Sequence, residues 1–225
     1  MLKLGLDLSL SSIRPQGVWS PDDETSLVAW YQNGEGITLN GSDVLEWADS
    51  APAALYNMRQ TTATEQPAYS GGVLTFVAAD KNNLQTSGQI TLTGKFTIGF
   101  RAQPTSTNVV ILADNTSSNE FVKYSTTTRI VVKIGGTTKN LNLDSGAFGD
   151  DYIVITRSGS NVLALYHNGV EQSGTQILSG SCLIDAIGVR ATDLNPYEGT
   201  AEEVQIYSDT SADLTANVNN RLSTL

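Results

Sequence analysis

The sequence predicts an all-β protein, built as an antiparallel β-sandwich or jelly roll. Threonine, serine and 20 glycines are spread along its 225 residues, and long runs of alanine, glutamate, lysine and leucine are missing. This composition is typical of short strands joined by turns. About ten to twelve strand-like segments follow one another without βαβ spacing, which favours antiparallel sheets. With 40% hydrophobic residues, the chain can bury a sizeable core.

Residues 1–25 read as an arm, separate from a domain at residues 26–225. In the arm, leucines alternate with lysine, glycine, aspartate and serine, and this period of two predicts a strand with one apolar face. A signal peptide would instead need a continuous apolar core of about 7–15 residues. Because an uncovered leucine face promotes aggregation, we expect the arm to add to the sheet edge of a partner. The leucines of this face are Leu2, Leu4, Leu6, Leu8 and Leu10.

Trp19 lies at the end of the arm, in the polar stretch QGVWSPDD, where the core of the domain cannot easily enclose it. Either it docks the arm onto a neighbouring surface or it folds back onto its own domain as a plug. We expect docking, which makes Trp19 part of the same partner-binding arm.

Alternation of apolar and polar residues marks the strands of the domain. In GKFTIGFRAQ, one face would carry Phe96, Ile98, Phe100 and Ala102, while Gly99 would lie on the other. The stretch NVVILAD is apolar on both faces and indicates a central strand, and NEFVKYS and TRIVVKIGG follow it as an expected pair. A three-stranded meander is expected in DDYIVITRSGSNVLALYHNGVEQSG. GGVLTFVAA, CLIDAIGVRA and AEEVQIYS complete the set of strands.

One helix is expected at the end of the chain. Leu214, Val218 and Leu222 fall at i, i+4 and i+8. Either Ser211 or Asp213 can cap the first turn. Since this apolar stripe is narrow, the helix should lie on the sandwich rather than inside it.

Three segments, in this order, are similar to laminin-G and concanavalin A-like jelly rolls, especially to the versions found in bacteriophage particle proteins. SLVAWYQNGEGITLNGSDVLEWADSA resembles the opening of the family, in which a tryptophan-bearing strand leads to a W-x-D-x-S-like segment. YIVITRSGSNVLALYHNGVEQ resembles its V-x-R-x-x-x-x-x-L-Y-x-N-G hairpin, and YEGTAEEVQIY resembles its closing strand. The likeness spans residues 26–225 and implies that fold. Trp30 and Trp47 sit in strand contexts, so we expect both in the core.

His167 is the only histidine of the chain and directly precedes Asn168-Gly169, the strongest short hairpin signal in the sequence. In the hairpin motif this position ends a strand and carries no fixed chemistry. Asparagine and glycine supply the left-handed conformations that a two-residue turn needs. We therefore interpret His167 as a turn-flanking residue without an orienting carboxylate, not as a catalytic base.

The acidic and thiol groups do not indicate an enzyme. The Glu-x-Asp-x-x-Glu strand of glucan-cutting sandwiches is missing, and an ordinary strand would point Glu202 and Glu203 to opposite faces. We expect Glu202 to be a solvated edge charge and Glu203 to support the closing strand. Cys182 is the only cysteine and has no nearby base, so we expect a buried free thiol.

Calcium is the metal that the resemblance implies, since members of the family often hold it at one rim through loop carboxylates and carbonyl oxygens. The candidates are Asp114, Asp144, Asp150 and Asp151. Their spacing matches no diagnostic calcium loop, and ordinary hydrogen bonding within turns also explains them. We therefore expect no cofactor, with calcium as the alternative.

Sugar binding usually needs an exposed aromatic ring with amide or carboxylate groups beside it. Tyr56, Tyr69 and Tyr197 lie in loop-like stretches and are the remaining candidates for stacking on a glycan. Each of them can instead be a half-buried packing residue.

Charge and hydropathy narrow the class of partner. A formal charge of −10 and a pI near 4.4 argue against binding of DNA or RNA through phosphates, and no segment approaches the roughly 20 apolar residues that span a bilayer. We expect a non-enzymatic virion structural protein, a capsid decoration, head-fibre or tail component assembled in the host cytoplasm. Its arm would attach it to other virion proteins. Assembly into a homo-oligomer is an alternative that the sequence does not decide. The alternative is a carbohydrate-binding adhesion module for host-surface glycans.

Overall fold

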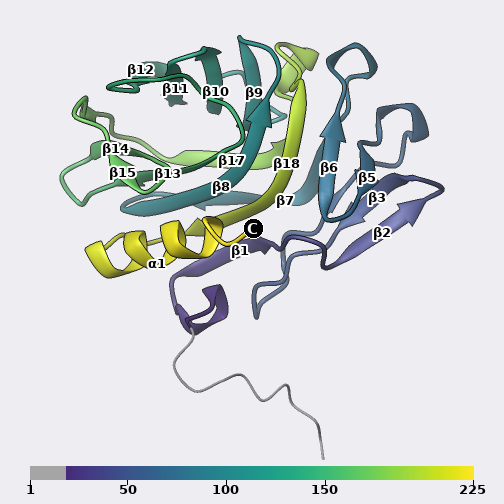
Figure 1. Cartoon of the computed structure of the whole chain (residues 1–225), viewed down its shortest axis with the longest axis horizontal. Helices are drawn as coiled ribbons and strands as arrows, with labels where there is room; N and C mark the ends of the chain where they lie inside the picture. Colours follow the sequence, from purple (N-terminus) through teal and green to yellow (C-terminus); the bar gives the residue numbers. More distant parts are fainter. Residues whose placement is uncertain (1–18) are drawn as a thin grey trace, which may run out of the picture.

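The computed structural model describes residues 19–225, which form two antiparallel β-sheets packed face to face with one helix outside them (Figure 1). The leucines of the predicted arm strand, Leu2 to Leu10, lie outside the described residues. Among the described residues, no helix is long and apolar enough to cross a membrane.

The first sheet contains five main strands and two short ones. They are β1 (Leu27–Tyr31), β8 (Phe96–Pro104), β13 (Asp151–Arg157), β14 (Val162–His167), β15 (Val170–Glu171), β16 (Gln176–Ile177) and β18 (Gly199–Tyr207). Hydrogen bonds connect the main strands in the order β1–β18–β8–β13–β14, and both short strands pair with β14.

The second sheet has seven strands in the order β4–β7–β17–β9–β10–β11–β12. These are β4 (Met58–Arg59), β7 (Leu84–Leu92), β9 (Val109–Ala113), β10 (Phe121–Thr126), β11 (Arg129–Ile134), β12 (Thr137–Asn142) and β17 (Cys182–Ile187). The expected pair NEFVKYS and TRIVVKIGG is confirmed as β10 and β11, and β9 is the central, fully buried strand that its sequence predicts.

A smaller antiparallel extension joins the two sheets at one edge (Figure 1). It consists of β2 (Ile37–Asn40), β3 (Asp43–Trp47), β5 (Ala68–Ser70) and β6 (Val73–Phe76). Strand β3 pairs with β4 of the second sheet, and β6 pairs with β18 of the first. Four short 3-10 turns lie in the connections: η1 (Pro21–Asp23), η2 (Ala63–Glu65), η3 (Ala78–Asp80) and η4 (Ala191–Asp193).

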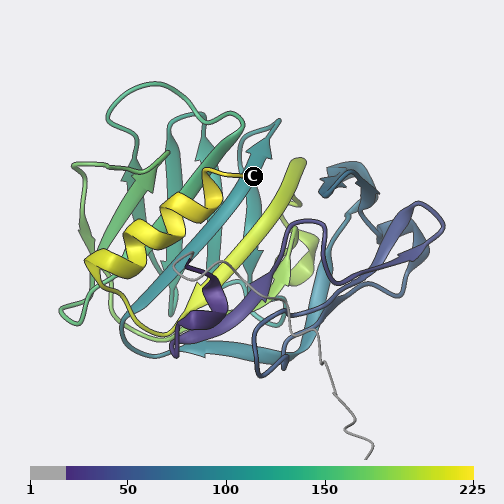
Figure 2. The ribbon, with the colours of Figure 1, turned by 60° about the horizontal axis from the view of Figure 1, so that its bottom comes forward.

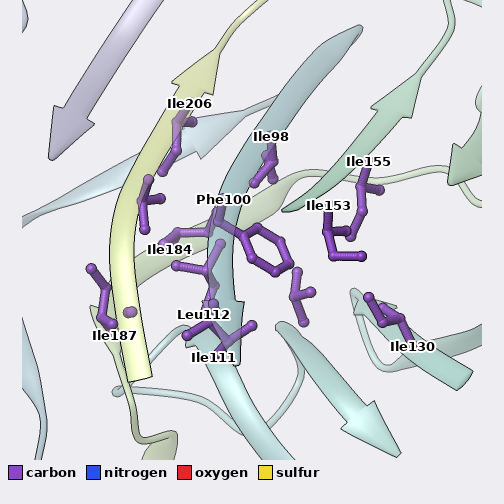
Figure 3. Close-up of a cluster of buried hydrophobic side chains, with 14 of the residues drawn as sticks. Ile98, Phe100, Ile111, Leu112, Ile130, Ile153, Ile155, Ile184, Ile187 and Ile206 are labelled. Atoms are coloured by element: carbon purple, nitrogen blue, oxygen red, sulfur yellow. The ribbon is translucent and has the colours of Figure 1, made fainter. Parts of the chain in front are cut away.

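The core lies between the sheets. Figure 3 shows side chains of β8, β13 and β18 pointing toward those of β9, β11 and β17. The predicted inner face of β8 is confirmed, since Phe96, Ile98, Phe100 and Ala102 are all buried. Trp30 and Trp47 are buried as well, as their strand contexts predict. Buried side chains of β1, β3, β4, β6, β7, β10 and β14 also belong to this core.

The sequence does not predict strands β7 and β12, which the structure contains. Between its buried ends, β7 carries the polar run Gln85–Gln89, and a register shift interrupts its pairing with β17. Only Leu141 of β12 is buried. Because alternation in both strands is weak, their formation depends on the neighbouring strands that pair with them.

The helix α1 (Ala212–Leu222) crosses the outer face of the first sheet (Figures 1 and 2). Ser211 is its N-cap, because the Ser211 hydroxyl accepts a 3.0 Å hydrogen bond from the backbone N–H of Leu214. The predicted stripe is buried, and it packs against Val154 of β13 and Tyr207 of β18. The helix therefore lies on the sandwich, as expected.

Trp19 packs against the same outer cluster as the helix. Its indole N–H donates a 2.9 Å hydrogen bond to Glu24. The aromatic ring contacts apolar surface on its own domain, which favours the fold-back alternative. Docking of the half-buried ring onto a partner surface stays a prediction.

A β-bulge in β18 changes the positions of the two neighbouring glutamates. It lies between Ala201 and Glu203 in the pairing with β8. Asn33 contacts both carboxylates, because its backbone N–H lies 3.2 Å from Glu203 and its side-chain amide 3.4 Å from Glu202. The expectation of opposite faces is therefore wrong. Glu202 is also no solvated edge charge, since its side chain is 18% exposed and lies 3.6 Å from Arg101.

Glu203 supports the closing strand, as predicted, through a fully buried carboxylate. The guanidinium of Arg221 donates two hydrogen bonds to it, at 2.8 and 3.1 Å. The indole N–H of Trp30 lies 3.0 Å away and the amide of Gln205 lies 2.6 Å away. These contacts join β1, β18 and α1 at one buried charge.

We predict that Glu203→Gln destabilises the protein by about 2–3 kcal/mol, because it leaves the partly buried Arg221 without its charged partner. Urea unfolding measures the change. Lys95→Gln is the matched control, since it breaks the half-exposed pair with Asp209 and should cost about 0.5 kcal/mol or less. Equal losses for the two variants would contradict the prediction.

Gly99 of β8 lies beneath α1, and a Cβ atom there would be 2.4 Å from Val218 Cγ1. We predict that Gly99→Ala costs about 1–3 kcal/mol, because the helix must move to admit the methyl group. Gly94→Ala is the control, since no atom lies within 4 Å of its Cβ position. Thermal unfolding of both variants checks this, and an unchanged midpoint for Gly99→Ala would show that the helix is not closely docked.

Candidate ligand-binding groove

A groove runs between α1 and the β13–β14 hairpin, on the outer face of the first sheet. It encloses about 340 Å³. We call it the helix groove, and its walls are Tyr152, Tyr166, Gly169, Ala212, Thr215, Ala216, Asn219 and Asn220.

The register of the hairpin places both tyrosines in this groove. In β13, Ile153 and Ile155 belong to the core between the sheets, so their neighbours Tyr152 and Val154 face outward. Val154 pairs with Tyr166 of β14, which puts the second tyrosine beside the first on the outer face. Both tyrosines are half-buried against the helix cluster. The adjacent strands therefore offer two aromatic side chains at one wall of the groove.

The opposite wall carries uncharged polar side chains of α1. Asn219 is 7% exposed, and its amide nitrogen donates a 2.9 Å hydrogen bond to the carbonyl of Thr215. Its carbonyl oxygen Oδ1 is buried and has no hydrogen-bond partner. A buried acceptor without a partner costs about 1–3 kcal/mol. Other atoms of Asn219 line the groove, together with Thr215 and Asn220.

Burial and the neighbouring carboxylate of Glu171 raise the pKa of the Tyr166 phenol above its ordinary value, at which the group is already protonated at neutral pH. The groove thus combines a phenol, hydroxyl and amide groups with apolar ring surface and no charged lining residue. Such a lining suits an uncharged ligand rich in hydroxyl groups.

The Asn168-Gly169 turn closes one end of the helix groove. The turn residues have φ angles of +50° and +79°, which confirms the predicted two-residue turn. His167 ends β14 directly before it, as predicted. However, His167 does have an orienting carboxylate, because its Nε2 lies 3.0 Å from Asp151. The expectation that no carboxylate faces His167 is wrong.

Asp151 holds this turn together through several hydrogen bonds. Its carboxylate accepts from the Gly149 N–H and from the Asn168 amide, each at 2.6 Å. Burial would raise the pKa of Asp151, but the bonds to His167, Gly149 and Asn168 outweigh it and lower the pKa. The imidazole of His167 also meets the Phe148 ring edge-on, at 5.7 Å between centroids. Asp151 and His167 therefore support the hairpin.

The aspartates considered for calcium bind neighbouring protein groups. Asp114 accepts two hydrogen bonds from Thr116, at 2.8 and 2.6 Å, and Asp150 lies 3.2 Å from Arg101. Asp144 accepts from Ser173, whose hydroxyl and backbone N–H lower the pKa of the carboxyl. Within residues 19–225, no group of three or more histidine, cysteine, aspartate and glutamate side chains could hold a metal ion. Only the contact of Asp114 is a local turn contact, because the partners of Asp144 and Asp150 lie 29 and 49 positions away in the sequence.

The three tyrosines proposed for glycan stacking lie elsewhere. Tyr197 is fully buried, and its hydroxyl donates to the carbonyl of Thr200, so it offers no face to a ligand. The expectation that Tyr197 stacks on a glycan is therefore wrong. Tyr56 and Tyr69 are half-buried and pack against the main core. None of the three lines the helix groove.

Cys182 is the buried free thiol that the sequence predicts. Burial raises the pKa of this thiol to about 12. The thiol is therefore protonated at neutral pH and weakly nucleophilic.

Sequence reasoning missed Tyr152 and Tyr166 because both sit inside strands, where aromatic residues usually serve the core. One signal could have found them. In DDYIVIT and LALYHNG, each tyrosine falls out of phase with the apolar residues that mark the inner face.

No protein-family model matches this sequence, and a search of curated proteins finds no match. Solved structures do resemble it. Domain 4 of AbnA, a GH43 extracellular arabinanase from Geobacillus stearothermophilus solved with arabinotriose, has a TM-score of 0.56 at 13% identity. The alignment covers 86% of this chain and 98% of that domain.

Two toxin domains are also similar. The binding domain of Paraclostridial Mosquitocidal Protein 1 has a TM-score of 0.55 at 13% identity. The binding domain of Botulinum neurotoxin DC, solved with rat synaptotagmin II, has a TM-score of 0.52 at 13% identity. Each alignment covers 90% of this chain but only about half of the toxin domain, 53% and 52%. At such low identity these likenesses show the fold alone, an antiparallel β-sandwich of the jelly-roll type with a short C-terminal helix.

Proposed function

We propose that this protein is a non-enzymatic carbohydrate-binding domain whose helix groove holds an uncharged sugar. The observation that carries this proposal is that one groove has Tyr152 and Tyr166 on one wall and uncharged polar side chains of α1 on the other. Sugars present apolar ring faces beside hydroxyl donors, which matches an aromatic wall opposite an amide wall. The structural likeness to an arabinanase domain solved with arabinotriose supports the same class of ligand.

The absence of catalysis is part of the proposal. His167 is used in supporting a turn, the Cys182 thiol is protonated, and the Glu203 carboxylate is paired with Arg221. Each of these three groups thus has a supporting contact or an unreactive form. Turnover of a polysaccharide by the purified protein, lost on changing one acidic side chain, would overturn this part.

We predict that Tyr152→Ala weakens binding of a neutral oligosaccharide about tenfold, because it removes one aromatic wall of the groove. Tyr152→Phe should bind within about threefold of the parent, since the ring remains. Screening immobilised neutral glycans, followed by titration calorimetry with the best one, measures the change.

Tyr69→Ala is the matched control, because Tyr69 is an equally half-buried tyrosine away from the groove. It should leave the affinity unchanged. Thermal unfolding of all variants separates lost binding from lost folding. If Tyr69→Ala abolished binding while Tyr152→Ala did not, the site would lie on the extension at β5 and the groove assignment would fail.

A second candidate function is display of this domain on a virus particle, with attachment to other virion proteins through residues 1–18. It rests on the alternating leucines Leu2 to Leu10, which need a partner to cover them.

We predict that a chain lacking residues 1–18 keeps its folded domain but fails to enter assembled particles. Mass spectrometry of purified particles measures incorporation. Normal incorporation of the shortened chain would contradict this candidate, and glycan binding by the groove would be unaffected in either case.

A further inference from the structure

The outer face of the second sheet carries three positive charges around one aromatic ring. Nζ of Lys123 and Nζ of Lys133 each lie 5.5 Å from the centroid of the Phe121 ring, and the Arg190 guanidinium carbon lies 5.2 Å from it. All three charges therefore lie within 5.5 Å of one point, the centre of the Phe121 ring, and are close to one another. We call Lys123, Lys133 and Arg190 the cation cluster.

Strand alternation directs this cluster away from the core. In β10, Val122 and Tyr124 belong to the main core, so Phe121 and Lys123 face outward. Phe121 packs there with Val110, Ala113 and Val131 in a small apolar cluster of its own. The helix α1 lies on the outer face of the other sheet and does not cover this one (Figures 1 and 2).

The cation cluster lacks the carboxylates that accompany other cations of the protein. Lys81, Lys95, Arg101 and Arg221 each lie within 4 Å of an aspartate or glutamate oxygen. Within the described part of the chain, none of the three clustered side chains forms such a pair. This is unexpected in a chain with a formal charge of −10, because carboxylates are abundant.

The hydrogen bonds of the cluster leave donors unused. Lys123 donates to the side-chain oxygen of Asn108 and Lys133 to the carbonyl of Ser118, each at 2.8 Å. Both acceptors are neutral, and each ammonium group has three donors. Nε of Arg190 is buried and has no hydrogen-bond partner at all. Burial and repulsion by Arg190 and Lys133 also lower the pKa of Lys123.

From this geometry we propose that the cation cluster binds a negatively charged oxygen group, a sulfate or carboxylate, carried by an acidic saccharide. One anion among three cations would neutralise their repulsion and accept the unused N–H donors. The cluster is compact and the rest of the chain is acidic, which fits one isolated anionic group better than a continuous phosphate backbone. The choice of a saccharide rests on the proposed function, whereas the anion site itself does not.

Competition binding with the full chain tests this inference. The protein is titrated against immobilised chondroitin sulfate, hyaluronan and neutral dextran, with inorganic sulfate as the competitor at constant ionic strength. Chondroitin sulfate carries both anionic groups and hyaluronan carries carboxylates alone, so the two distinguish the sources of the charge. We expect binding to one or both acidic polymers, displacement by inorganic sulfate, and weaker binding as the salt concentration rises.

Single substitutions locate the site. Arg190→Gln and Lys133→Gln should each weaken binding to the acidic polymer about tenfold, since each removes a charge-assisted hydrogen bond. Lys81→Gln removes one positive charge at a half-exposed pair with Asp193 and should change the affinity less than twofold. Two cluster variants are included so that poor folding of one, detected by thermal unfolding, leaves the other informative.

The outcomes test the anion site at the cation cluster separately from the proposed sugar site in the helix groove. Loss of acidic-polymer binding in both cluster variants, with neutral-glycan binding retained, supports it even if the groove proposal fails. Equal weakening by Lys81→Gln would show general charge attraction and overturn the site. Loss in Tyr152→Ala but not in Arg190→Gln would place the acidic ligand in the groove and overturn it too. Binding of a short DNA duplex as tight as that of the acidic polymer would overturn the choice of a saccharide.

Discussion

The buried carboxylate of Glu203 constrains the whole helix-bearing side of the molecule. A fully buried charge is stable only if protein groups replace the hydrogen bonds that it would make with water. Here the guanidinium of Arg221, the indole of Trp30 and the amide of Gln205 do so. These groups come from α1, β1 and β18, so satisfying one charge fixes the relative position of three elements. Since α1 supplies a whole wall of the helix groove, the shape of that groove depends on the same contact.

The two outer faces of the sandwich differ because one helix covers only one of them. On the first sheet, α1 docks closely over Gly99, and Tyr152 and Tyr166 line its margin as an uncharged groove. On the second sheet, three cationic side chains lie over the ring of Phe121 in place of a helix. Attraction between cations and an aromatic face helps to gather these side chains, although it does not neutralise them. The helix groove is therefore polar and uncharged, whereas the cation cluster on the other outer face is positive.

Several elements could be predicted from the sequence because local pattern and final environment agree. The inner face of β8, the central strand β9, the Asn168-Gly169 turn and the cap at Ser211 all follow from spacing and residue type. The sites could not be predicted in the same way. A tyrosine in a strand becomes a groove wall only when a helix from another part of the chain docks beside it. The bulge at Glu202 likewise depends on how β18 pairs with β8, and no local residue marks it.

His167 shows why residue type alone is a poor guide to chemistry in this fold. Its imidazole faces Asp151 and the ring of Phe148, while the adjacent Tyr166 points to the opposite side of the strand and lines the helix groove. The side chain with catalytic potential thus supports the hairpin, and its neighbour lines the helix groove. Three other groups are likewise engaged within the protein. The thiol of Cys182 is buried, and the carboxylates of Glu203 and Asp151 accept hydrogen bonds from neighbouring side chains. Among the described residues, Oδ1 of Asn219 and Nε of Arg190 are buried without a hydrogen-bond partner, and so are Nε of Arg101 and the hydroxyl of Tyr124, so unsatisfied atoms are not confined to the two surfaces proposed for binding.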